Sequence, residues 1–153
     1  MTPPEIDILV GQMMEAYASD AVDAARANFN IELDYSPASV KAVEELLGRV
    51  YPAVRRGWFR RFFRIGLSDG ELETICKMFG GYIGEVVRRQ KGGTWQLVQD
   101  PIGTENVIAL VNGEGRIFPP SKVYKRLVNG AEDDVWFYFQ VVTDLAERVG
   151  EPA

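Results

Sequence analysis

The sequence predicts an α+β fold in which N-terminal helices, a three-stranded antiparallel meander and two C-terminal helices follow one another. Apolar residues recur at helical spacing from about residue 4 to residue 90. Branched and aromatic residues separated by turn signals then occupy residues 94–119, which is typical of strands. Helical signals return after Ser121. Because helices and strands are segregated along the chain, we expect the helices to pack on one face of a small sheet.

Two helices are predicted before residue 53. The first covers residues 4–28, with Met13 among the apolar positions at helical spacing. The second is expected to begin with Ser36 as its N-cap and Pro37 at its first position, and to end near Pro52. Residues 53–66 alternate arginines with aromatic residues and are compatible with a short helix of their own.

A third helix is predicted from Ser68 to about Gln90. Ser68 and Glu71 have the spacing of a capping box, and Gly92 stops the helix. Three glycines lie inside it, at positions 80, 81 and 84. Because each costs about 1 kcal/mol relative to alanine in a helix, we infer that another backbone or a ligand comes close to this helix.

The remaining chain is predicted to form the meander and two further helices. Strands are expected at residues 94–98, 106–111 and 116–119, with a turn at 112–115. Ser121 is expected to cap a helix over residues 122–128. A final helix is expected to start at Glu132 or Asp133 and to run through Val149, with the acids at its positive end.

Length and composition indicate one domain over residues 1–153 without a cofactor, and the kind of metal site that they leave open is a carboxylate site for magnesium or calcium. The chain has 153 residues, 46% of them hydrophobic, no histidine and one cysteine. The missing histidine excludes histidine-based nucleophilic and acid–base catalysis and disfavours zinc. Cys76 lies on an apolar helical stripe, where we expect a buried thiol. With no signal peptide or membrane span apparent, we expect a cytoplasmic protein.

The chain has a net charge of −5, and its charged residues are unevenly distributed along the sequence. Residues 1–48 contain nine acids and two bases, residues 49–91 ten bases and four acids, and residues 92–153 nine acids and five bases. Either the basic centre neutralises the acidic flanks within the fold, or the segregated charge recruits a partner of opposite sign. The acidic flanks would fit a partner with a basic surface.

Glu85 is the first candidate for a functional residue. It lies beside the glycines of the third predicted helix, where a carboxylate can bind a cation or act as a base. The structural alternative is an ion pair with Lys122, Lys125 or Arg126, or a hydrogen bond from Trp95 that holds the helix against the meander. Acid chemistry would require burial to raise the pKa of Glu85.

Four bases complete the candidate site for a ligand or partner: Arg88, Lys122, Lys125 and Arg126. The last three are spaced by three and four residues and can form a basic face that accepts an anion or an acidic surface. Alternatively, they form a solvated helix face, and Arg88 complements the negative end of its own helix.

A separate candidate for nucleic-acid binding is the segment from Arg55 to Arg64, with Arg56, Arg60 and Arg61 as the proposed contacts. Bases interleaved with aromatic side chains can hold phosphates and stack on nucleobases. The acidic net charge and the lack of a nucleic-acid-binding motif argue against this function.

Three stretches, in this order, resemble an uncharacterised family of small bacterial domains over about residues 31–140. They are LDYSPASV (33–40), GGYIGEVVRR with GGTW (80–95), and PPSKVYKRL with NG (119–130). The resemblance implies a bacterial source and brings no assigned activity. Size and charge are also loosely similar to those of toxin-immunity proteins. The sequence thus favours a non-catalytic protein-binding module, a toxin antagonist or regulator, over an enzyme or ligand-binding domain centred on Glu85.

Overall fold

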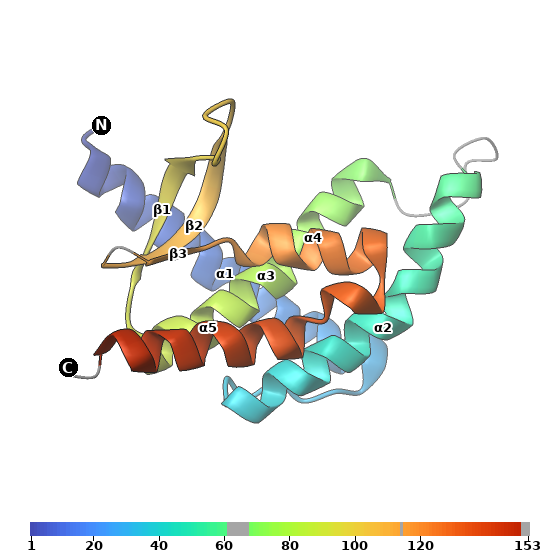
Figure 1. Ribbon diagram of the computed structural model, residues 1–153. Coiled ribbons are helices and arrows are strands. Elements are labelled where there is room, and N and C mark those ends of the chain that lie inside the picture. Colours follow the sequence, from blue (N-terminus) through green and yellow to red (C-terminus); the bar gives the residue numbers. More distant parts are fainter. Residues whose placement is uncertain (61–67, 114, 151–153) are drawn as a thin grey trace.

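The computed structural model describes residues 1–60, 68–113 and 115–150, and for residues 56–60 and 145–150 it describes the backbone alone. These parts form an α+β fold, as predicted, with helices in contact with a three-stranded antiparallel sheet (Figure 1). The elements are α1 (Pro3–Phe29), α2 (Pro37–Arg60), α3 (Asp69–Lys91), β1 (Thr94–Gln99), β2 (Asn106–Asn112), β3 (Gly115–Ile117), α4 (Pro119–Asn129), the 3-10 helix η1 (Ala131–Asp133) and α5 (Val135–Gly150).

α2 extends further than the sequence suggested. Its start is as predicted, since Pro37 is its first residue and the Ser36 hydroxyl accepts a 3.3 Å hydrogen bond from the Ser39 amide. The expected end near Pro52 is wrong, because the helix continues through Pro52 to Arg60. A proline removes one backbone hydrogen bond and crowds the preceding turn, which can bend a helix without ending it. Figure 1 shows α2 changing direction along its length.

α3 is the central element of the fold and contacts α1, α2, α4, α5 and the sheet. The Ser68 hydroxyl accepts a 3.2 Å hydrogen bond from the Glu71 amide, so the Ser68 half of the predicted capping box forms. Gly92, with φ of 79°, caps the other end where the sequence placed it. Every residue from Phe79 to Val87 is buried, so this part of α3 is enclosed on all sides.

The sheet has the order β1-β2-β3, with Trp95 opposite Leu110 and Leu110 opposite Ile117. β3 is shorter than predicted because α4 begins at Pro119, with Phe118 as its N-cap, and not after Ser121. Prolines suit the first helical positions, whose amides have no partner within the helix. In Figure 1, β1 lies in front of α1, which it contacts.

α5 begins later than predicted. The chain first forms η1, and α5 starts at Val135. Asp134 takes the capping role, since its Oδ1 accepts a 2.8 Å hydrogen bond from the Phe137 amide. Asp133 is turned away from this end and binds Lys122 at 2.9 Å. The acids predicted at the start of this helix are therefore divided. Asp134 caps α5, while Asp133 belongs to the short 3-10 helix before it.

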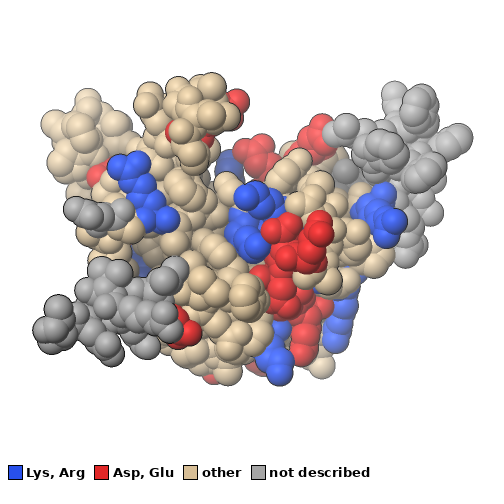
Figure 2. All heavy atoms as spheres, viewed as in Figure 1, with Lys and Arg blue, Asp and Glu red and all other residues tan. Residues whose placement is uncertain are grey.

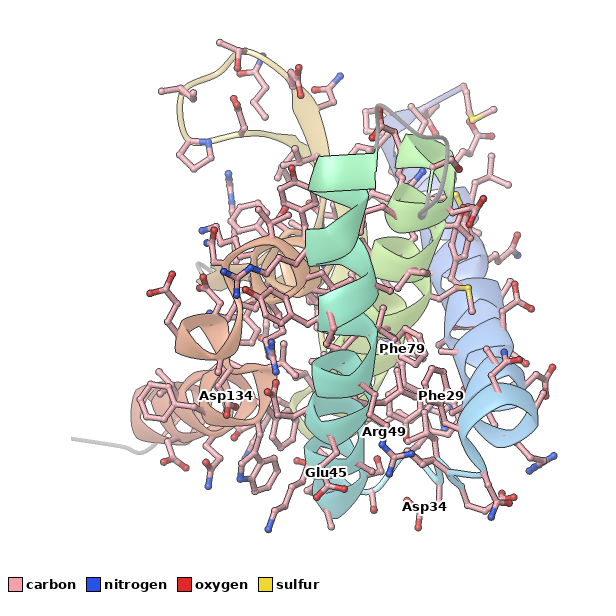
Figure 3. All side chains as sticks on the ribbon, turned by 90° about the vertical axis from the view of Figure 1, so that its right-hand side faces the viewer. Phe29, Asp34, Glu45, Arg49, Phe79 and Asp134 are labelled. Atoms are coloured by element: carbon pink, nitrogen blue, oxygen red, sulfur yellow. The ribbon has the colours of Figure 1, made fainter. Side chains whose placement is uncertain are left out.

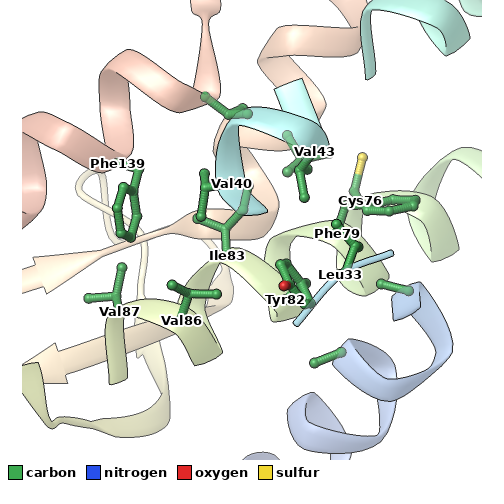
Figure 4. Close-up of a cluster of buried hydrophobic side chains, with 14 of the residues drawn as sticks. Leu33, Val40, Val43, Cys76, Phe79, Tyr82, Ile83, Val86, Val87 and Phe139 are labelled. Carbon is green, nitrogen blue, oxygen red and sulfur yellow. The ribbon is translucent and has the colours of Figure 1, made fainter. Parts of the chain in front are cut away.

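The core surrounds α3. Figure 4 shows side chains of α2 and α5, such as Val40 and Phe139, facing Ile83, Val86 and other apolar side chains of α3. In the side view of Figure 3, α2 stands between α1 and the C-terminal helices, with Phe79 of α3 behind it. None of the helices in the described ranges combines the length and apolar character needed to cross a bilayer.

Cys76 is buried, with 5% of its surface exposed, as predicted. Burial, reinforced by the charge of Glu73, raises the pKa of its thiol to about 12. Because the thiolate is the reactive form, we expect the native protein to resist a thiol reagent at about pH 8 and to react at once in denaturant. Timing the colour release of a disulfide reagent checks this, and a full thiol titre within seconds in native buffer would contradict it.

Candidate functional site

Glu85 lies in the enclosed part of α3, and none of its surface is exposed. Its Oε1 accepts 2.8 Å hydrogen bonds from Arg88 Nε and from Trp95 Nε1, and its Oε2 accepts one of 2.8 Å from Arg88 Nη2. Arg89 Nε is 3.8 Å from Oε2. The carboxylate therefore forms a two-point ion pair with Arg88 and ties α3 to β1 through the indole.

The environment of Glu85 keeps its carboxylate charged. Burial by itself would raise the pKa, but the hydrogen bonds from Arg88 and Trp95 and the charges of Arg88 and Arg89 outweigh it. The pKa of Glu85 consequently lies below its ordinary value of 4.5. A general acid needs a raised pKa, so this geometry supports a structural ion pair. The basic partners are Arg88 and Arg89, and not Lys122, Lys125 or Arg126, while the expected hydrogen bond from Trp95 is present.

The glycines of α3 make room for neighbouring segments. A Cβ atom at Gly80 would lie 2.4 Å from Pro120 Cα, and one at Gly84 would lie 2.2 Å from Cη2 of the Trp95 ring. At Gly81 it would lie 3.1 Å from the Met14 carbonyl oxygen. The close approach inferred from the sequence is therefore made by the chain itself, and the indole fills the space next to Glu85.

Arg88 connects this ion pair to α1, because its Nη2 also lies 3.3 Å from Glu15 Oε1. Arg89 stacks its guanidinium 3.6 Å above the ring of Tyr35. Tyr35 adopts a left-handed backbone conformation with φ of 62°, and its amide donates a 2.8 Å hydrogen bond to the buried Tyr82 hydroxyl. Two of the stretches that carry the family resemblance, residues 33–40 and 80–95, thus meet around α3.

Lys122, Lys125 and Arg126 do not form a common exposed face. Lys122 binds Asp133 at 2.9 Å, and Arg126 is 5% exposed. Lys125 is the exposed residue of the three. On the face shown in Figure 2, basic and acidic side chains lie next to each other to the right of centre, over α4 and η1. Lys122 and Arg126 each form an ion pair within the molecule, and neither Arg88 nor Glu85 takes part in these pairs.

Glu44 is the partner of Arg126 and was not predicted. Its Oε1 accepts a 2.7 Å hydrogen bond from Arg126 Nε, and its Oε2 accepts one of 2.9 Å from the Val135 amide. Glu44 thereby joins α2 to α4 and to the start of α5. Nη1 of Arg126 is buried without a hydrogen-bond partner among the described residues. The sequence signal that could have indicated Glu44 is a carboxylate among the apolar positions Val43 and Leu46 of the second helix.

The candidate contacts for nucleic acid lie outside the described side chains. Arg61 falls in the gap after residue 60, and for Arg56 and Arg60 only the backbone of α2 is described. Within the described parts of the chain, no three side chains of the metal-binding types come together in a way that could hold an ion.

The outer face of α1 combines exposed apolar and acidic side chains. Five exposed residues follow one another at alternating spacings of four and three, which places them on one helix face: Leu9, Met13, Ala16, Asp20 and Asp23. We call them the α1 stripe. Leu9 is 50% and Met13 38% exposed, and Ile8 beside them is 60% exposed. The opposite face, which includes Val10 and Met14, is buried in the core.

Comparisons with models of protein families, with curated proteins and with solved structures gave no match to this chain. The resemblance to a family of small bacterial domains therefore stays a prediction, and the function must be argued from the chain's own side chains.

Proposed function

We propose that this chain is a non-catalytic protein-binding module of the bacterial cytoplasm, acting as a regulator or toxin antagonist, and that it binds a protein with a basic surface through the α1 stripe. The observation that carries the proposal is the exposure of Leu9 and Met13 in line with Asp20 and Asp23. Exposed apolar side chains clustered beside polar ones are typical of protein–protein contact surfaces. Methionine also adapts readily to the shape of a partner.

The candidate site at α3 supports a binding role over catalysis. Glu85, the residue best placed for acid–base chemistry, is enclosed and bound by Arg88 and Trp95. A substrate would have to displace these groups to reach the carboxylate. The ion pair instead fixes α3 against β1 and, through Arg88, against Glu15 of α1. A rigid α1 presents its outer face to a partner with little loss of conformational freedom.

The test is affinity purification of the tagged protein from its source cells at low salt, analysed by mass spectrometry. We expect one stoichiometric partner with the wild type, and its loss with the double variant Leu9→Arg and Met13→Arg. Phe137→Arg is the matched control, because Phe137 on α5 is 67% exposed and lies outside the stripe. Retention of the partner by the α1 variant, or no stoichiometric partner for the wild type, would overturn the proposal.

A further inference from the structure

The α1 stripe is divided into an apolar half and an acidic half. Leu9, Met13 and Ala16 form the first half, and Asp20 and Asp23 form the second. Leu9 and Asp20 are eleven residues apart, which corresponds to about 16 Å along a helix. Because the alternating spacing of four and three keeps all five residues in line, the stripe has the geometry of one seam of a helix pair.

The acidic half forms no ion pair with a base among the described residues, and the one base whose electrostatics it affects is Arg26, through Asp23. Arg26, the base that follows them on α1, is held by Glu32 through two hydrogen bonds of 2.9 Å. Because the hydrogen bonds of Arg26 go to Glu32, the carboxylates of the stripe keep their hydrogen-bonding capacity for positive charge from outside the molecule.

From this pattern, and resting on the proposed function, we infer that the partner presents a single α-helix to α1, with an apolar half that packs on Leu9 and Met13 and a basic half that reaches Asp20 and Asp23. A helix surface offers no free backbone edge for a strand, so a β-strand would gain no ladder hydrogen bonds here. A second copy of this chain fits poorly, because in parallel pairing the aspartates would face aspartates, and in antiparallel pairing they would face the apolar half.

Three synthetic helical peptides of about 20 residues test this inference, since shorter helices are marginal in water. The first carries leucines in one half and lysines in the other half of the same face. The second has glutamates in place of the lysines. The third has the composition of the first, with leucines and lysines distributed around the helix. Fluorescence anisotropy measures the binding of each labelled peptide to the whole protein at low and at physiological salt.

We expect the first peptide to bind at least about tenfold more tightly than either of the others, and salt to weaken its binding. The double variant Asp20→Lys and Asp23→Lys should reverse the preference, so that the glutamate peptide binds best. Glu45→Lys with Glu105→Lys is the control, since it changes the net charge equally at exposed positions on α2 and before β2. This control should leave the preference as in the wild type.

Failure of the first peptide to bind, equal binding of the redistributed peptide, or an unchanged preference in the aspartate variant would each overturn the inference. The proposed function is judged separately by the capture experiment. A captured partner that depends on Leu9 and Met13 but contacts α1 without a basic helix would leave the binding function standing and would refute the helical partner.

Discussion

Replacing Gly80 or Gly84 by alanine is expected to lower the free energy of unfolding by about 3 kcal/mol or more. The added methyl group would lie 2.4 Å from the backbone of Pro120 in the first case and 2.2 Å from the Trp95 ring in the second. Alanine would contribute about 1 kcal/mol of helix propensity, which this overlap outweighs. Gly80→Ala should lower the stability more than Gly84→Ala. The backbone of Pro120 cannot rotate away from the added methyl group, whereas the Trp95 side chain can.

Gly11→Ala is the matched control for these variants. Gly11 lies inside α1, and a Cβ atom there would meet nothing within 4 Å. The same substitution should therefore stabilise the protein by about 0.5–1 kcal/mol. Urea unfolding of the three variants measures the difference. If Gly80→Ala and Gly11→Ala shifted stability in the same direction, the contact between α3 and α4 would not be as close as described.

Glu85→Ala is expected to cost about 2–4 kcal/mol, because it removes a fully buried side chain that Arg88 binds at two points and leaves the Trp95 indole nitrogen without an acceptor. Glu85→Gln should cost less, since its amide oxygen can still accept from Trp95. Glu15→Gln is the control. Glu15 binds the same arginine but is 56% exposed, so its loss should change stability by no more than about 0.5 kcal/mol.

The Glu85 pair also predicts how stability depends on pH. The pKa of Glu85 is lowered from 4.5 in the folded protein. The stabilisation from its ionised form is therefore complete above pH 4.5 and is lost as the pH falls through the folded-state pKa. We expect the stability difference between wild type and Glu85→Gln to stay constant near neutral pH and to shrink in acid. A difference that grew on acidification would contradict this account.

Patterns within a few residues predicted most of the fold. Ser68 as a cap, Gly92 as a stop and the change of period at Thr94 each depend on local hydrogen bonding or local backbone freedom. The prediction failed at Pro52, because the helix continues beyond this residue and Val54 still packs against the core, a tertiary contact that local rules do not include. Pro119, the predicted end of the third strand, is likewise the first residue of α4.

The candidate site was predictable only in part. Glu85 was found from its glycine neighbours, and Trp95 was among its expected partners. Glu44 was missed, because its ligands Arg126 and the Val135 amide are distant in sequence and meet only in the folded chain. Met13 was assigned to the apolar side of the first helix but is partly exposed. Periodicity shows that a helix is apolar on more than one side, and only the fold shows which side stays uncovered.

The enclosure of α3 also constrains the order in which the molecule can form. α1 lies before α3 in the chain, while Trp95 and Pro120, which fill the space at Gly84 and Gly80, follow it. A chain leaving the ribosome has α1 and α3 available for pairing before either filling residue can arrive. Until residue 120 has emerged, one side of α3 therefore stays open to water, and completion of the core waits for the closure of long loops.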